Sequence, residues 1–205
     1  RSGRERIIMS NAAGASKRPY VVASIMLANF MVAIEATIAA TAMPRIVGEL
    51  GGFTYYSWVF SAFLLTQSAT TVIYGKLADV LGRKPVLIAG TIIFLVGSLT
   101  SALAWNMVTL IAFRGLQGLG AGSIMATVNP LAGDLYSVRE RASIEGWFSS
   151  VWGIAAIVGP TIGGAFAEYA SWRWIFLINL PVGVAALVLV GKFLHETPER
   201  HRHRI

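Results

Sequence analysis

The chain has 205 residues, of which 55% are hydrophobic and only 13% are charged. Soluble domains carry about 25% charged residues, so this composition excludes an ordinary soluble protein and indicates a protein embedded in lipid. The net charge of +7 makes nucleic acid a partner to test, and the absence of cysteine excludes disulfides and cysteine-ligated metals.

Six segments are long and apolar enough to cross a bilayer, which takes about 20 residues of helix. They cover residues 20–43, 56–74, 86–104, 107–131, 142–167 and 175–194. We therefore predict an all-α membrane protein in which a six-helix transmembrane bundle occupies residues 20–194. The flanking segments are polar and basic. Residues 1–19 are predicted to form a cytoplasmic N-terminal tail, and residues 195–205 a cytoplasmic connector.

The basic residues indicate the orientation of the bundle. Most of the 17 Lys and Arg residues lie in the two terminal segments and in the loops that would share their side of the membrane. Only Arg45 and Arg173 lie in the opposite loops. Since cytoplasmic loops are enriched in Lys and Arg, both termini are predicted to be cytoplasmic, and the basic surplus reflects topology rather than nucleic-acid binding. Aromatic residues, which favour the headgroup layer, gather at the predicted outer boundary: Tyr55, Tyr56, Trp58, Trp105, Trp172 and Trp174.

The sequence GKLADVLGRK, residues 75–84, is predicted to form a tight, charged turn between the second and third spans. Gly75 and Gly82 would let the chain turn. The charged residues Asp79, Arg83 and Lys84 would then lie where the membrane meets water.

Glycines with helical spacing mark the fourth and fifth spans. Small residues at such spacing let helices approach closely in lipid. Ordinary helix packing alone can account for the glycines of either span. The functional signal comes from the arginine and the proline that lie beside these glycines within the membrane. The residues are Gly115, Gly118 and Gly122 in the fourth span, and Gly159, Pro160 and Gly163 in the fifth.

Only two ionisable residues, Glu35 and Arg114, lie deep within predicted spans. An ionisable group at the centre of a membrane helix costs at least about 2.5 kcal/mol, which makes each a functional candidate. At about 1.5 Å per residue, both lie about 10–12 Å from the predicted outer ends of their helices, so they can meet. They could form a structural ion pair, or Glu35 could carry a proton whose presence Arg114 senses.

Other polar and aromatic side chains within the spans could line a cavity for a flat, lipophilic ligand. Amides also join helices, and aromatic rings at helical spacing also serve packing alone. The candidates for a substrate cavity are Asn29, Gln67, Gln117, Trp147 and Trp152.

Taken together, these motifs resemble the major facilitator superfamily of transporters. Residues 75–84 follow G-x-L-A-D-x-x-G-R-K, similar to the family's signature loop between its second and third helices, and RGLQGLGAG from Arg114 is similar to its fourth-helix motif. GIAAIVGPTIGG resembles the family's fifth-helix antiporter motif, carried by Gly153, Gly159, Pro160, Gly163 and Gly164. IEATIAATAMP at 34–44 and SWRWIFLINLPVG at 171–183 are similar to the fourteen-helix drug:proton antiporter branch.

Three positions depart from the family pattern. Val80 follows the loop aspartate where a basic residue is common, and the first-helix motif has Glu35 and Ala40 where aspartate and asparagine are common.

The resemblance implies two inverted three-helix repeats that form the N-terminal half of a transporter, whose C-terminal half is missing from this chain. It implies a multi-pass protein of the bacterial inner membrane that exports small lipophilic, cationic compounds in exchange for protons, with Glu35 as the proton carrier. It also implies a cytoplasmic gate in which Arg83 pairs with Asp134 while Asp79 faces the missing half.

The sequence contains no convincing enzyme motif, and no cofactor or metal is expected. GLGAG at 118–122 lacks the last glycine of a dinucleotide fingerprint and follows no predicted strand. His195, His201 and His203 lie in the polar C-terminal segment. Two alternatives to export remain: a non-transporting half-facilitator that binds a partner, and proton-coupled uptake of a solute by the same fold.

Overall fold

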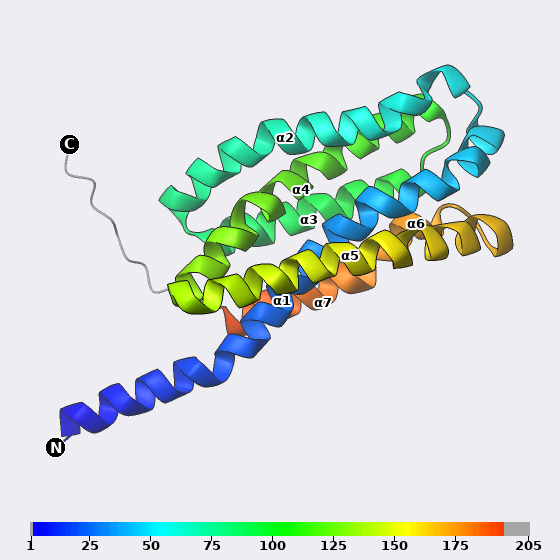
Figure 1. The fold of residues 1–205 in the computed structure, drawn as a ribbon. Helices are drawn as coiled ribbons and strands as arrows, with labels where there is room; N and C mark the ends of the chain where they lie inside the picture. The colour runs from blue at the N-terminus through cyan, green and yellow to red at the C-terminus, as the bar shows by residue number, and fades with distance from the viewer. Residues whose placement is uncertain (1, 195–205) are drawn as a thin grey trace.

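The computed structural model describes residues 2–194, which form helices and no strand (Figure 1). The prediction of an all-α fold is therefore confirmed. The predicted connector, residues 195–205, lies outside the described residues. The elements are α1 (Ser2–Leu50), η1 (Phe53–Tyr55), α2 (Tyr56–Leu81), α3 (Arg83–Ala102), α4 (Met107–Leu135), α5 (Val138–Tyr169), α6 (Trp174–Leu177) and α7 (Asn179–Phe193).

Five segments within the described part of the chain are long and apolar enough to cross a membrane. They are Pro19–Leu50, Arg83–Ala102, Met107–Asp134, Val138–Tyr169 and Trp174–Phe193. The remaining predicted span corresponds to α2, whose 26 residues include several Ser, Thr and Gln that lower its hydropathy. Its outward side chains are nevertheless largely apolar, among them Leu64, Leu65, Val72 and Ile73. The chain is therefore an integral membrane protein built from six long helical segments.

The first helix extends beyond both ends of the predicted span 20–43. The backbone is helical from Ser2, so the segment predicted as a tail continues directly into α1. At the other end the helix passes through the exposed Pro44 and ends at Leu50, where Gly51 and Gly52 adopt positive φ angles of 68° and 72°. Arg45 and Glu49, interpreted as loop residues, form an exposed ion pair one turn apart at 3.2 Å.

The sixth predicted span is divided into α6 and α7 at Ile178. Pro181 has no backbone N–H to donate to the carbonyl of Leu177, so the helical ladder is interrupted there. Asn179, the first residue of α7, is thereby placed at the break, fully buried.

The helices form two groups that lie side by side (Figure 1). One contains α2, α3 and α4, and the other contains α1, α5 and α7. The helix α4 packs against α2 and α3, while α1 packs against α5 and α7, and α1 also contacts α4. If α1, α2 and α3 are exchanged in order with α4, α5 and α7, the pattern of helix contacts stays the same. Two related three-helix repeats would produce such a pattern.

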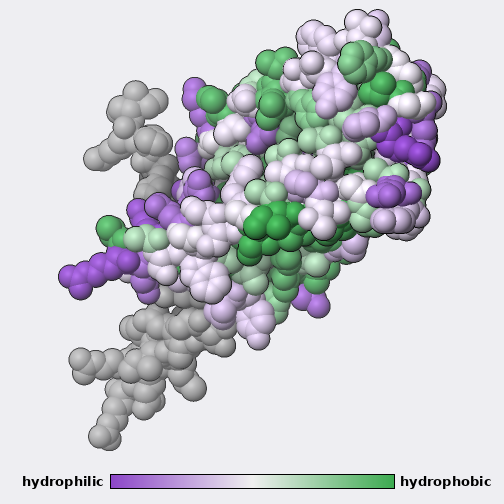
Figure 2. Space-filling view, turned by 45° about the vertical axis from the view of Figure 1, so that its right-hand side comes forward, coloured by the Kyte–Doolittle hydropathy of each residue, from purple (hydrophilic) through white to green (hydrophobic). Residues whose placement is uncertain are grey.

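We call the end of the bundle that contains the α2–α3 and α4–α5 turns the Gly82 end, and the opposite end the Gly52 end. On the face seen in Figure 2, strongly hydrophilic residues gather mainly toward the ends, with weakly polar and hydrophobic residues between them. Such a surface suits a bundle that lies in lipid over its middle part.

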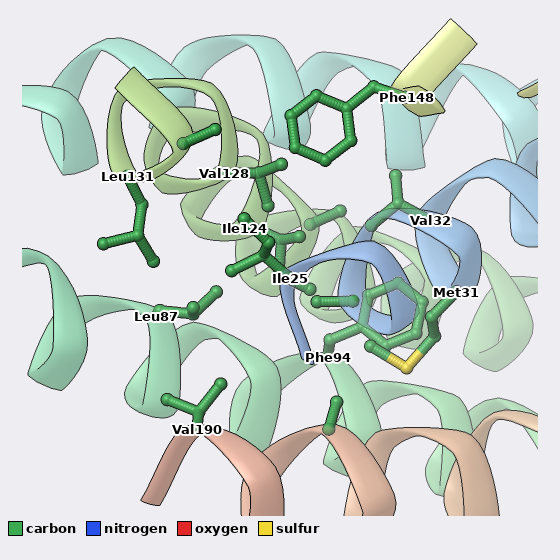
Figure 3. Close-up of a cluster of buried hydrophobic side chains, with 14 of the residues drawn as sticks. Ile25, Met31, Val32, Leu87, Phe94, Ile124, Val128, Leu131, Phe148 and Val190 are labelled. Atoms are coloured by element: carbon green, nitrogen blue, oxygen red, sulfur yellow. The ribbon is translucent and has the colours of Figure 1, made fainter. Parts of the chain in front are cut away.

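Buried apolar side chains form two clusters, one toward each end. The cluster toward the Gly82 end includes Ile25, Phe94 and Phe148 (Figure 3). The cluster toward the Gly52 end includes Met43 and Trp172. Trp172, one of the aromatic residues at the predicted outer boundary, is fully buried within the protein, and its indole N–H donates to the Glu49 carboxylate at 2.8 Å.

Candidate functional site

Glu35 and Arg114 meet at mid-height of the bundle, between the two apolar clusters. Glu35 comes from α1 and Arg114 from α4, and their side chains are 0% and 1% exposed. The Nη1 group of Arg114 donates a hydrogen bond to Oε1 of Glu35. The prediction that the two side chains can meet is thus confirmed. Counting residues from the helix ends was enough to make it, because the rise per residue of a helix is fixed.

Several further groups surround the Arg114 guanidinium. Its Nη1 also donates to the side-chain oxygen of Gln117 at 2.9 Å, and its Nε donates to the carbonyl of Val59 on α2 at 3.3 Å. The guanidinium carbon lies 4.4 Å from the ring centroid of Phe63 and 5.8 Å from that of Phe176. A guanidinium over an aromatic face gains a cation–π attraction, so α2 and α6 both help to hold this charge.

The second oxygen of Glu35 is held from the opposite side by Asn179. The amide nitrogen of Asn179 donates to Oε2 of Glu35 at 2.6 Å and contacts the hydroxyl of Ser98 on α3 at 3.0 Å. The Ser98 hydroxyl in turn donates to the carbonyl of Phe176 at 2.7 Å. Neither Asn179 nor Ser98 was predicted as a site residue, although an amide beside a proline within an apolar span was a visible signal.

The result is a buried polar layer that joins α1, α3, α4 and α7. Both oxygens of Glu35 accept hydrogen bonds from nitrogen donors, one from Arg114 and one from Asn179. Gln117, predicted to line a cavity, lies within this layer; its amide nitrogen is buried and has no hydrogen-bond partner among the described residues.

The predicted charged turn is shorter than expected. Gly75 was expected to let the chain turn, but it lies inside α2, which continues to Leu81. The turn is made at Gly82 alone, with φ 95° and ψ 156°, a conformation open essentially to glycine only. Asp79 is consequently an exposed residue on the last turns of α2.

The charged residues after Gly82 join three helices at this end of the bundle. Arg83 forms an ion pair with Asp134 of α4, with Nη1 and Oδ2 2.5 Å apart. The Lys84 ammonium donates to the carbonyls of Gly191 and Leu194 at 3.0 and 2.6 Å. Because the last carbonyls of a helix lack backbone partners, Lys84 satisfies the C-terminal end of α7.

Two of the fifth-helix motif glycines form the contact between α5 and α1. A Cβ atom at Gly163 would lie 2.5 Å from the carbonyl oxygen of Ile38, and one at Gly159 would lie 3.0 Å from Cβ of Thr37. The Thr37 hydroxyl crosses this contact and donates to the carbonyl of Ala155 at 3.0 Å. The other members of the motif lie outside this contact: Gly153 and Gly164 have open space around them, and Pro160 is half-buried within α5.

The glycines of the fourth helix are likewise of two kinds. A Cβ atom at Gly122 would lie 2.8 Å from the carbonyl oxygen of Gln67, and Gly118 packs equally closely against Phe63 and Thr66. Gly115 has only an ordinary contact, at 3.8 Å from Thr66. Close packing between α4 and α2 therefore needs two of the three predicted glycines.

Of the predicted substrate-cavity residues, the structure brings only Asn29 and Trp152 to one cavity. This cavity, of about 470 Å³, lies between α1, α4 and α5. Gln67 is half-buried on α2, and Trp147 is 61% exposed on α5; neither lines this cavity or a neighbouring cavity of about 290 Å³ beside Arg83 and Asp134. Within that part, no group of three His, Asp or Glu residues could hold a metal ion.

Comparisons with known proteins agree with this architecture. A family model described as Major Facilitator Superfamily matches residues 25–205. The chain is similar to the multidrug transporter protein MdtP of Bacillus subtilis, with 42% identity over 186 residues that cover 91% of this chain and 34% of that protein. It is 41% identical to the efflux pump dotC of Dothistroma septosporum, over 87% of this chain and 31% of the pump. It is also 36% identical to the multidrug resistance protein 3 of Bacillus subtilis, over 91% and 36% of the two chains. The chain thus spans about a third of the length of these relatives.

Proposed function

Because the chain belongs to the Major Facilitator Superfamily, we propose that it forms the N-terminal half of a proton-coupled exporter of small, lipophilic cations. The observation that carries this proposal is the buried carboxylate of Glu35, held at mid-height of the bundle by Arg114 and Asn179. The names of two similar proteins, a multidrug transporter and an efflux pump, support export rather than uptake.

Glu35 is suited to carry the coupling proton because its protonation changes what Arg114 faces. A buried guanidinium that loses its counter-charge is unfavourable by several kcal/mol. Protonation of Glu35 therefore favours a second arrangement of the helices in which Arg114 finds other partners or water. A proton that binds the two arrangements with different affinity shifts the balance between them.

A cationic substrate would drive the reverse change. A positive charge within the cavity stabilises the ionised form of Glu35 and so favours release of its proton, without any requirement that the two ligands touch. Binding of the cation and loss of the proton are then opposed events on one protein, which is the basis of antiport.

The close contact between α5 and α1 places the fifth-helix motif beside the proton carrier. Thr37 and Ile38, which contact Gly159 and Gly163, lie within one helical turn of Glu35. A shift of α1 that follows protonation would be transmitted to α5, since the two backbones are too close for side chains to absorb it.

The charges at the Gly82 end would form the gate. Arg83 and Asp134 hold α3 to α4, and the exposed Asp79 would pair with the second half of the transporter. Breaking the pairing of Asp79 would accompany opening at this end. Partly exposed ion pairs contribute little to stability, so the gate would act on the populations of states.

The same end of the bundle would face the cytoplasm. Between residues 19 and 194 it carries six basic residues, whereas Arg45 and Arg173 lie at the Gly52 end. The positive-inside rule then supports a cytoplasmic N-terminus, and the membrane in which we propose the protein lies is a bacterial inner membrane. These six residues are Lys76, Arg83, Lys84, Arg139, Arg141 and Lys192.

The proposal is tested by transport in inverted membrane vesicles that contain the full-length protein. Ethidium accumulation driven by an imposed proton gradient should occur with the unmodified protein and be lost in Glu35→Gln. Glu168→Gln, which neutralises an exposed carboxylate on α5, is the matched control and should transport normally. Gradient-driven accumulation by Glu35→Gln at the unmodified rate would overturn the proposal.

A further inference from the structure

Asn179 and Ser98 connect the carboxylate of Glu35 to the backbone of α6. The amide nitrogen of Asn179 lies 2.6 Å from Oε2 of Glu35 and 3.0 Å from the hydroxyl oxygen of Ser98. The Ser98 hydroxyl lies 2.7 Å from the carbonyl oxygen of Phe176, to which it donates. Asn179 and Ser98 are 1% and 0% exposed, so this chain of hydrogen bonds is shielded from bulk water.

The direction of each hydrogen bond in this chain follows from the charge of Glu35. An ionised carboxylate only accepts hydrogen bonds, so Asn179 presents its NH₂ group to it. The same amide nitrogen faces the oxygen of Ser98, which therefore accepts. The one hydroxyl proton of Ser98 is left for the carbonyl of Phe176.

A protonated Glu35 is compatible with the opposite directions. Its carboxyl O–H is a donor, and the amide oxygen of Asn179 can accept it once the amide turns about its Cβ–Cγ bond. The Ser98 hydroxyl can then rotate and donate to the same amide oxygen, since a hydroxyl both donates and accepts. The proton stays on Glu35 throughout, and the carbonyl of Phe176 loses its side-chain donor.

The short helix α6 is placed to respond to that loss. It has only four residues, and Pro181 supplies no N–H to the carbonyl of Leu177. The ring of Phe176 lies 5.8 Å from the guanidinium carbon of Arg114 and packs edge-to-face on Trp172, with 6.2 Å between the ring centroids. A change at the Phe176 carbonyl therefore acts on a residue that contacts both the polar layer and the Gly52 end.

Arg114 is the one other charged group at the depth of Glu35 in the described helices. The stretches of α2, α3, α5, α6 and α7 that pack around the site contain no charged residue, namely residues 56–75, 85–104, 146–167 and 174–191. The response to a proton on Glu35 is therefore divided between Arg114 and the neutral chain that begins at Asn179.

We propose that Asn179 and Ser98 are positioning residues that reverse their hydrogen bonds when Glu35 is protonated and so transmit the state of the carboxyl group to α6. Glu35 must be the proton carrier proposed above for this relay to operate. Because an amide and a hydroxyl can each reverse without a change of volume, the relay needs no movement of the helices for its first step.

The contact between Asn179 and the protonated carboxyl group is tested by infrared difference spectroscopy. Purified full-length protein is moved from alkaline to acidic buffer, and the carboxyl C=O band of Glu35 is identified by its loss in Glu35→Gln. In Asn179→Leu, which has a similar volume and no amide, the band should move to higher frequency because the carboxyl group has lost a hydrogen-bond partner. An unchanged frequency would overturn the relay.

The second step is tested with phenylalanine labelled with ¹³C at its carbonyl. The acid-induced difference spectrum of the unmodified protein should contain a labelled carbonyl band that is lost in Ser98→Ala and kept in Ser98→Thr, which retains the hydroxyl. Thr100→Val is the matched control on α3, since the Thr100 hydroxyl donates to the carbonyls of Val96 and Gly97 on its own helix and should leave the band unchanged.

Export provides a functional readout in the inverted vesicles described above. Asn179→Leu should slow ethidium accumulation at least about tenfold, the effect of losing a hydrogen bond to a charged group, and Ser98→Ala about fivefold. Thr100→Val should accumulate ethidium at the unmodified rate. A labelled band that persists in Ser98→Ala would refute the relay even if export is slowed.

The outcomes separate the relay from the proton carrier. If no Glu35 band appears in the unmodified protein on acidification, Glu35 takes up no proton and both proposals fail. If the band appears and is the same in Asn179→Leu, only the relay fails. If Asn179→Leu does not yield monodisperse protein, the smaller change Ser98→Ala decides the relay through the labelled carbonyl band.

Discussion

Replacement of Arg114 by methionine removes every donor that the guanidinium supplies to the buried polar layer. The variant loses the ion pair with Glu35 and the hydrogen bonds to Gln117 and Val59, and it leaves the carboxylate 0% exposed without its cation. Breaking a buried ion pair by removal of one partner costs about 3–5 kcal/mol. We expect Arg114→Met to lower the free energy of unfolding by that amount.

The double variant Glu35→Met, Arg114→Met provides the sharper test. Replacing both members of a buried pair by apolar residues is often nearly neutral, so the double variant should be more stable than either single variant. The difference between its cost and the sum of the two single costs should be about 3 kcal/mol or more. Additive costs would show that the two side chains are not paired.

The free energies can be measured by unfolding the purified full-length protein with sodium dodecyl sulfate in mixed micelles, followed by circular dichroism. Arg45→Met is the matched control, because the pair of Arg45 with Glu49 has side chains that are 60% and 43% exposed. Exposed pairs one turn apart contribute only about 0.3–0.5 kcal/mol. An Arg114→Met cost no larger than that of Arg45→Met would refute the buried pair.

Three further predictions concern the gate and the helix contacts, and each is checked on the full-length protein. Gly82→Ala should lower the free energy of unfolding by about 1–3 kcal/mol in the same assay, because the φ angle of Gly82 is 95°. Gly75→Ala should not lower it, because Gly75 is helical and a Cβ atom there would meet open space. Gly163→Val should force α5 from α1 and reduce the yield of monodisperse protein, whereas Gly164→Val should not; equal yields would contradict the contact. Asp79→Asn should shift spin-label distances across the gate toward the state open at the Gly82 end, with unfolding unchanged; an unaltered distance distribution would count against a gating role.

The helical framework was predictable from the sequence because bilayer thickness and helix rise fix how many apolar residues a span needs. The resemblance to the major facilitator superfamily, taken from motifs in residues 75–84, 114–122 and 153–164, is confirmed by the family comparison. The ends of helices were less predictable. The first span was predicted to end at residue 43, with Arg45 in a loop, but an exposed proline in a helix and an ion pair one turn apart are compatible with continued helix.

The polar layer was predictable only in part. A charged residue within an apolar span is conspicuous in the sequence, so Glu35 and Arg114 could be selected as site candidates and their depths in the membrane compared. Asn179 carries no charge, and its placement depends on the helix break that Pro181 causes. Ser98 gave no signal, since a serine in a membrane helix commonly bonds to its own helix. Gly75 and Gly82 could not be told apart, because which glycine takes a positive φ is decided by where α2 ends.

Proton release during substrate binding tests the central assignment most directly. Purified full-length protein in weakly buffered detergent solution is mixed with tetraphenylphosphonium, and the protons released are measured with a pH indicator over acidic to alkaline starting values. The unmodified protein and Glu168→Gln are predicted to release protons in a pH-dependent manner, whereas Glu35→Gln is predicted to release none. Release by Glu35→Gln equal to that of the unmodified protein would contradict the assignment of Glu35 as the proton carrier.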